Sequence, residues 1–159
     1  MDDGATWKTI ASGVSGNNCD WPVPTPLNNK KKCRVKVIGY NGSTKVGSDI
    51  SDTFTVDTIR LTSPNGGENF QGRSWHEIKW VTYSTKRKVV KTKIYYTKDN
   101  GLTWKLIKAV SGNPGSYNWL APSFSNTKNK YKVKVILLDQ DGYIIGTDVS
   151  DEYFTISLP

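Results

Sequence analysis

The chain contains an internal repeat with an offset of about 100 residues, and this feature restricts its fold more than any other. Asp2–Ile10 (DDGATWKTI) returns as Asp99–Ile107 (DNGLTWKLI). Later landmarks keep the same order, with the matches Trp21 to Trp119, Pro24 to Pro122, Arg34–Ile38 to Lys132–Ile136, Ser51-Asp52 to Ser150-Asp151 and Phe54–Val56 to Phe154–Ile156. A unit of about 100 residues has the size of a small domain and is far longer than a solenoid or propeller-blade repeat.

The polarity pattern inside the unit predicts strands and no long helix. Val133, Val135 and Leu137 recur on alternate residues, the period of a strand with one buried face. Ile94–Tyr96, followed by the turn Lys98–Gly101, predicts a β-hairpin. We expect strands near residues 59–63, 74–82, 89–97, 103–110, 116–120, 130–138 and 152–157. About seven short strands in such a unit predict an all-β, immunoglobulin- or fibronectin-III-like β-sandwich.

The repeat divides the chain into an incomplete unit and a complete one. We expect residues 58–159 to form a complete sandwich, and residues 1–57 to match only the back half of a second, lacking about three front strands. Such a half exposes an apolar sheet face and an unpaired edge, which favours association into a dimer or fibre. Either the sequence is cut from a longer repeat array, the simpler explanation, or another chain supplies the missing half.

Several motifs of the complete unit resemble a known group of secreted repeats. They are Leu61–Phe70 (LTSPNGGENF), Ile78–Trp80, Asp99–Trp104, Trp119 with Pro122, and Ser150-Asp151 followed by Phe154. This combination resembles the Ig-like repeats of bacterial and archaeal surface proteins, related to a domain of fungal cell-wall assembly proteins and Ser/Thr-rich anchored proteins. The resemblance implies an extracellular or cell-surface module without catalysis: a spacer, stalk or subunit-contact domain of an adhesive protein or filament. It implies no cofactor.

A shorter motif, Thr97–Trp104 (TKDNGLTW), resembles the Asp box of sialidase propellers. In that family the motif is a structural hairpin in which Asp caps the turn, Gly takes a positive φ and Trp fills the core. A sialidase also needs several blades and an arginine cluster, for which this chain is too short. We therefore interpret the motif as structural.

The residues that could carry catalysis or bind a metal are few. His76 is the single histidine, so any nucleophile–histidine arrangement depends on it alone. One His and two Cys, placed in different units, do not make a zinc site. Asp139, Asp141 and Asp148 could bind calcium, although a polar hairpin turn at Asp139–Gly142 is the simpler interpretation. We expect no enzyme, no cofactor and no metal.

The six tryptophans divide into core and surface candidates. Positions that recur in each unit are expected in the core, because every copy must fill the same space. We assign Trp7, Trp21, Trp80, Trp104 and Trp119 to the core. Trp75 points away from Trp80 in an extended strand and is the candidate for exposure. Trp75 with Tyr83 could bind sugar, which makes a carbohydrate-binding module of a secreted enzyme the alternative function.

The net charge of +8 favours anionic partners. Its densest run is Lys86-Arg87-Lys88, a possible binding site for a cell-wall or anionic polysaccharide. Nucleic-acid binding would need basic groups interleaved with stacking aromatics in a recognised fold, and no such motif is present. No run of 18 or more apolar residues predicts membrane insertion, and Met1–Gly4 lacks the order of a secretion signal.

Cys19 and Cys33 are the two cysteines, and both lie in the incomplete unit. They align with Tyr117 and Tyr131, so a tyrosine pair in one unit replaces a cysteine pair in the other. The alignment predicts a disulfide between facing positions, with two buried free thiols as the alternative. A bond closing this short loop would stabilise the half unit by about 3 kcal/mol.

Overall fold

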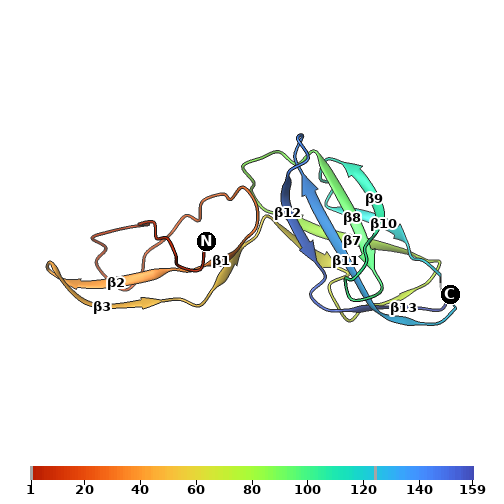
Figure 1. Cartoon of the computed structure of the whole chain (residues 1–159), viewed down its shortest axis with the longest axis horizontal. Coiled ribbons are helices and arrows are strands. Elements are labelled where there is room, and N and C mark those ends of the chain that lie inside the picture. Colours follow the sequence, from red (N-terminus) through yellow and green to blue (C-terminus); the bar gives the residue numbers. More distant parts are fainter. Residues whose placement is uncertain (1, 124) are drawn as a thin grey trace.

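A computed structural model describes residues 2–123 and 125–159 as an all-β chain, with no helix among them (Figure 1). The strands are β1 (Lys30–Cys33), β2 (Lys36–Asn41), β3 (Thr44–Ile50), β4 (Phe54–Val56), β5 (Ile59–Ser63), β6 (Asn69–Gln71), β7 (Trp75–Thr82), β8 (Lys91–Thr97), β9 (Lys105–Ser111), β10 (Ser116–Leu120), β11 (Lys128–Leu138), β12 (Ile144–Val149) and β13 (Phe154–Ser157). In the described ranges there is accordingly no helix long and apolar enough to cross a membrane.

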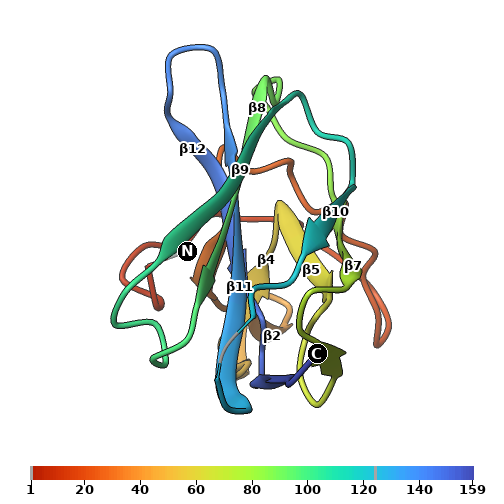
Figure 2. The same ribbon diagram turned by 90° about the vertical axis from the view of Figure 1, so that its right-hand side faces the viewer.

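Residues 58–159, called the sandwich below, form two packed sheets (Figure 2). One sheet has the order β10-β7-β5, and the other has the order β6-β13-β11-β8-β9 with β12 also paired to β11. All pairs are antiparallel except β13 with β6. The core between the sheets consists of Ile59, Leu61, Ile78, Trp80, Ile94, Trp119, Ala121, Tyr131, Val133, Val135, Leu137, Ile145, Phe154 and Ile156. The predicted all-β sandwich is confirmed.

The seven predicted strands of this unit are all present, with ends within two residues of those expected. The prediction missed β6 and β12. β6 has only three residues, too few for a periodic pattern. β12 contains Gly146 at its centre, and glycine inside a strand weakens the sequence signal.

Residues 2–57, called the arm below, extend away from the sandwich (Figure 1). The arm contains two separate two-stranded ladders, β1–β4 and β2–β3. Only Pro26 and Cys33 are buried among its residues. The arm therefore has backbone pairing without a core of its own.

A partly buried group of hydrogen bonds joins the arm to the sandwich. The Thr58 N–H donates to Asn29 Oδ1 at 2.9 Å, and the Thr58 hydroxyl lies against the same oxygen and 3.1 Å from the Ile145 carbonyl oxygen. The Asn29 side-chain amide donates to the Thr147 carbonyl at 3.1 Å. The junction thus rests on β12, where Gly146 leaves room for Thr58.

Candidate interaction surfaces

The ladders of the arm have the registers of the ladders in the back half of the sandwich. In β2–β3 the pairs include Val37–Asp49 and Gly39–Gly47, and in β11–β12 they include Val135–Asp148 and Leu137–Gly146. In β1–β4 the pairs are Lys30–Val56 and Cys33–Phe54, and in β11–β13 they are Lys128–Ile156 and Tyr131–Phe154. Each pair of ladders also has its irregularity at the corresponding place.

The turn between β8 and β9 has the geometry expected of the Asp-box hairpin. The Asp99 carboxylate accepts hydrogen bonds from the Thr103 N–H and hydroxyl, at 2.9 and 2.5 Å, and from the Thr97 hydroxyl at 2.6 Å. These bonds, first that of Thr103, lower the pKa of Asp99 to about 2. Asn100 and Gly101 have φ of +61° and +85°. The structural interpretation of this motif is confirmed for the turn itself.

The arm repeats this turn near its beginning. The Thr6 hydroxyl donates to the Asp2 carboxylate at 2.5 Å, and this bond lowers the pKa of Asp2. Asp3 and Gly4 have φ of +62° and +89°, close to the values of the second turn. A lysine lies over the tryptophan that follows each turn: Lys36 Nζ is 5.4 Å from the Trp7 ring centroid, and Lys134 Nζ is 4.0 Å from that of Trp104.

Two further contacts occur in both regions. The Val133 N–H donates to Ser150 Oγ at 2.9 Å, and the Val35 N–H donates to Ser51 Oγ at 3.0 Å. Trp119 and Phe154 meet edge to face at 6.5 Å, and Trp21 and Phe54 do so at 6.4 Å. The same local contacts therefore form with and without a surrounding core.

The surface of β2 and β3 distinguishes the arm from the sandwich. Val37 is 65% exposed and Val46 is 66% exposed. The corresponding residues of the sandwich, Val135 and Ile145, are fully buried. In the sandwich β11 has a strand on both sides, β8 and β12, whereas β2 pairs only with β3 among the described residues. The arm thus exposes Val37 and Val46 on the face that corresponds to the core side of the sandwich, whereas its exposed Ile38, Tyr40 and Ile50 lie on the opposite face of the ladder.

The tryptophans predicted for the core divide into three groups. Trp80 and Trp119 are buried there. Trp21 and Trp104 are only half-buried, and Trp7 is 45% exposed. Trp104 does not belong to the core or pack against it, so the core positions expected for Trp7 and Trp104 are wrong. The physical reason is that the Asp-box tryptophans pack beneath lysine side chains on the outer face of the sheet, a cation–π contact instead of core packing.

The predicted ligand-binding residues do not form one site. Trp75 is 68% exposed, as expected, and Tyr83 is also exposed. Trp75 begins β7 and Tyr83 directly follows its last residue, so the two lie about 26 Å apart at about 3.3 Å per residue. Trp75 instead lies opposite the exposed Leu120 of β10. A platform combining Trp75 with Tyr83 is excluded by this distance.

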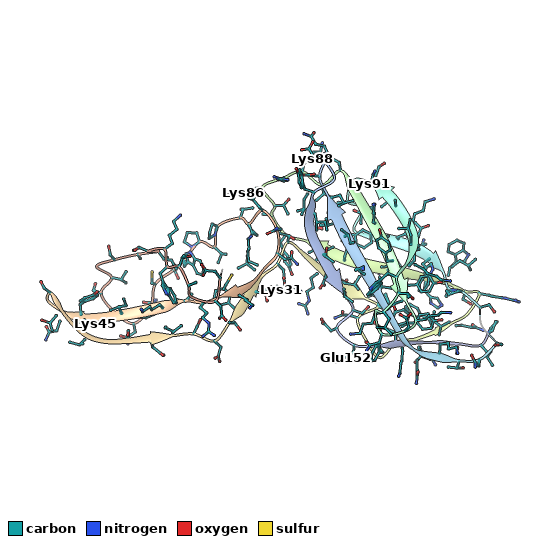
Figure 3. The ribbon with its side chains drawn as sticks, viewed as in Figure 1. Lys31, Lys45, Lys86, Lys88, Lys91 and Glu152 are labelled. Carbon is teal, nitrogen blue, oxygen red and sulfur yellow. The ribbon has the colours of Figure 1, made fainter. Side chains whose placement is uncertain are left out.

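The basic run Lys86-Arg87-Lys88 lies in the loop between β7 and β8, at one end of the sandwich (Figure 3). Arg87 does not point freely to solvent, because its guanidinium is 2.6 Å from the Asp139 carboxylate and 5.1 Å from the Tyr143 ring centroid. Lys86 and Lys88 are exposed, without an aromatic contact among the described residues. Lys86 and Lys88 are therefore surface lysines, whereas Arg87 between them is held by Asp139.

The acidic residues weighed as calcium ligands have structural contacts. Asp139 Oδ1 accepts from the Asp141 and Tyr143 N–H groups at 3.1 and 2.9 Å, which is the polar hairpin turn predicted. Asp148 Oδ2 accepts from the Leu61 N–H of β5 at 2.6 Å, and burial raises its pKa. In the described parts of the chain, no three His, Cys, Asp or Glu side chains are grouped to hold a metal ion. The hydrogen bond from the Leu61 N–H to Asp148, which links β5 to β12, was not predicted from the sequence.

Cys19 and Cys33 are both free, so the predicted disulfide is not formed. Cys33 is buried at the end of β1, and Cys19 is exposed in the loop that precedes it. The alternative of two buried thiols is also wrong for Cys19. The loop from residue 8 to residue 29 forms no strand in the arm, so alignment with β10 did not place Cys19 opposite Cys33.

An open pocket lies on the outer face of the larger sheet, between β8, β11 and the β11–β12 turn. Its lining includes Lys91, Lys93, Tyr95, Ile136 and Ile144. The neighbouring Lys134 Nζ is 5.4 Å from the Tyr95 ring centroid, and burial lowers the pKa of Lys134. Aromatic faces on this surface are thus covered by the protein's own lysine.

No protein-family model and no curated protein sequence matches the chain. Among solved structures, the chain is similar to a Clostridium thermocellum CbhA fibronectin(III)-like module, with 18% sequence identity and a TM-score of 0.45. The similarity covers 63% of this chain and 94% of that chain. The strands, sheets and core of this chain show the sandwich architecture by themselves.

Proposed function

We propose that this chain is a non-catalytic, extracellular structural or adhesive module that works through protein–protein contact. In this proposal the arm is the back half of an immunoglobulin-like repeat, and the exposed face of β2 and β3 is its contact surface. The partner is a neighbouring Ig-like repeat or another copy of the chain. The location outside the cell rests on the resemblance of the sequence motifs to surface-protein repeats.

The observation that carries the proposal is a comparison. The ladders and the turn of the arm match those of the sandwich in register and geometry, but the arm residues are exposed where the matching sandwich residues are buried. Residues such as Val37 and Val46 occupy core positions of a repeat but face solvent. Monomeric proteins rarely leave a contiguous apolar face uncovered, and such faces mark contact sites. A contact role therefore accounts for a surface that a spacer complete in itself would not need.

Sedimentation velocity of the full chain over a range of concentrations tests this function. We expect the average mass to rise with concentration, because the uncovered face associates when no other partner is present. The double variant Val37→Lys, Val46→Lys should stay monomeric. The matched control Leu106→Lys, Ile144→Lys places the same charge at exposed sandwich positions and should associate as the wild type does. Association that survives the arm variant would contradict the proposal.

A second candidate is a carbohydrate-binding module, favoured by one observation. Trp75 and Leu120 lie opposite each other on neighbouring strands and are both exposed. An exposed indole can stack on a sugar ring, since the face of a sugar is apolar. A panel of neutral and anionic glycans, with Trp75→Ala as control, separates the two functions. Binding lost in Trp75→Ala would support this candidate, and no binding would leave the contact function.

A further inference from the structure

We propose that the free edge of β2 is a strand-acceptor site that takes the front half of another Ig-like repeat. The occupant is a stretch of polypeptide with the alternation of β8, and its strand runs antiparallel to β2 as β8 does beside β11. This inference rests on the proposed contact function and specifies its geometry. Strand addition to a sheet edge gains affinity from backbone hydrogen bonds and specificity from alternate side chains.

The sandwich supplies the template for this pairing. β8 pairs with β11 in the register Tyr96–Val133, Ile94–Val135 and Thr92–Leu137. The arm residues at the corresponding positions are Val35, directly before β2, and Val37 and Gly39 of β2, because β2–β3 and β11–β12 share one register. An added strand in the same register puts an apolar residue opposite Val37 and covers it as Ile94 covers Val135. A slip of one residue would turn its apolar residues to solvent.

Asp49 is the second residue that fits a front half docked on the arm. It corresponds to Asp148, whose carboxylate accepts the Leu61 N–H of β5, a strand of the front half. Asp49 is exposed, and its Oδ1 accepts only a bond from the adjacent Ile50 N–H among the contacts described. A front half docked on the arm brings a β5-type backbone to this carboxylate.

Gly47 is the third residue that fits a front half docked on the arm. Its counterpart Gly146 has no room for a side chain, because a Cβ there would clash with Thr58 Oγ1 and lie 2.9 Å from Ile59 Cγ2 at the entry to β5. A Cβ on Gly47 would meet nothing within 4 Å, and Gly47 has no positive φ that would require glycine. Glycine at position 47 fits an occupant whose β5 entry packs there, as residues 58 and 59 pack on Gly146.

These features favour the front half of a repeat over a second copy that pairs β2 with β2. Pairing of two β2 strands about a two-fold axis would satisfy the edge, but it brings no β5-type strand to Asp49 or Gly47. Charge agrees with a β8-like strand as well. Residues 1–58 contain seven Lys or Arg and six Asp or Glu, so the arm does not repel a basic strand as the rest of the chain would.

Register-specific cross-linking tests the inference. The probe is a synthetic peptide of residues 88–98 carrying Ile94→Cys, and the protein is the full chain with Cys19→Ser and Val37→Cys. Under mild oxidation we expect a disulfide to form about tenfold faster than with peptides carrying the cysteine at position 92 or 96 instead, because only facing positions meet disulfide geometry. The chain with Cys19→Ser alone measures reaction at the buried Cys33.

Hydrogen exchange gives a second measurement that needs no cysteine. The wild-type-sequence peptide should slow amide exchange of residues 35–40 in the full chain, and a peptide with Asp at positions 92, 94 and 96 should not. Equal cross-linking at all three positions, or no protection of β2, would overturn strand addition. Preferential Val37→Cys dimers of the chain, unaffected by peptide, would overturn it in favour of a second copy. Loss of association in Val37→Lys, Val46→Lys alongside either result would leave the contact function standing.

Discussion

The arm and the sandwich contain two strand ladders of matching register in two different surroundings. Both regions have these ladders, and both have two consecutive positive-φ residues at the matching turn. In both, a serine hydroxyl accepts a hydrogen bond from a backbone N–H at the matching position, Ser51 from Val35 and Ser150 from Val133. They differ in burial, since Val135 is fully buried and Val37 is exposed. The comparison teaches that turn chemistry and strand register are specified locally, whereas burial requires the front strands β5 to β8.

This difference has an energetic consequence. Each large apolar side chain that becomes buried contributes about 1.5–3 kcal/mol, and the arm lacks that contribution at most of its core-type positions. An isolated two-stranded hairpin is marginal in water. We therefore expect the arm to open locally at lower free energy than the sandwich, so that equivalent substitutions have unequal effects in the two regions.

The largest expected contrast is between Trp119→Ala and Trp21→Ala. Trp119 is buried between the sheets against Phe154, so its removal should lower the free energy of unfolding of the sandwich by about 3–5 kcal/mol. Trp21 makes the same edge contact with Phe54 but is half-buried, and its loss should leave the sandwich transition unchanged. Urea denaturation measures both. Equal shifts would show that the arm and sandwich unfold as one unit.

The next contrast is between Gly146→Ala and Gly47→Ala. The methyl group at position 146 would overlap Thr58 and Ile59 at the junction, and such overpacking costs about 1–3 kcal/mol. The methyl group at position 47 meets open space and should leave the melting temperature of the isolated chain unchanged. Thermal melting followed by circular dichroism compares the two. A destabilising Gly47→Ala would mean that this face is already covered within the chain.

A smaller contrast is expected between Ser150→Ala and Ser51→Ala. Ser150 Oγ is buried, accepts from the Val133 N–H and donates to the Pro64 carbonyl at 2.8 Å. Its removal leaves buried groups unpaired and should cost about 1–2 kcal/mol. Water can replace the Ser51 hydroxyl at the exposed Val35 N–H. Hydrogen exchange at Val133 and Val35 should accelerate strongly in the first variant and little in the second.

Much of the fold could be predicted from the sequence because the signals are local. Period-two alternation in 130–138 and the Asp-Asn-Gly turn specify a strand and a hairpin without knowledge of the rest of the chain. Most residues of the arm are exposed, and its assignment as half of a repeat stays a prediction. β12 was missed because Gly146 weakens its strand pattern. Glycine is required there by the close approach of Thr58, which lies 88 residues earlier in the sequence.

The candidate site was less predictable, because exposure depends on which face of a sheet a residue occupies. Recurrence of Trp7 and Trp104 indicated a shared position, but recurrence does not distinguish a core from a lysine-covered outer face. Likewise, Trp75 and Tyr83 are near in sequence, but the whole length of the extended strand β7 separates them. The contact role that we propose for Val37 follows only from comparing its exposure with that of Val135.

The smallest expected effect concerns the two Asp turns and their dependence on pH. Hydrogen bonds from Thr103 and Thr97 lower the pKa of Asp99 to about 2 from its ordinary 3.8, and the bond from Thr6 lowers that of Asp2. A group with a lowered folded pKa adds stability above its unfolded pKa and loses it as pH falls through the folded value. The contribution of Asp99 should therefore be complete at neutral pH and disappear between about pH 4 and pH 2.

Carboxyl carbon chemical shifts measured by NMR report this titration for both residues. We expect Asp99 to titrate near pH 2 in the wild type and to move toward its ordinary value in Thr103→Val, which removes the hydroxyl that lowers its pKa most. Thr6→Val should shift the midpoint of Asp2 in the same direction. Because the two turns form without help from the core, the shift on substitution should survive in the arm even under mild denaturant that opens β2 and β3. A midpoint of Asp2 that does not respond to Thr6→Val would break the equivalence of the two turns.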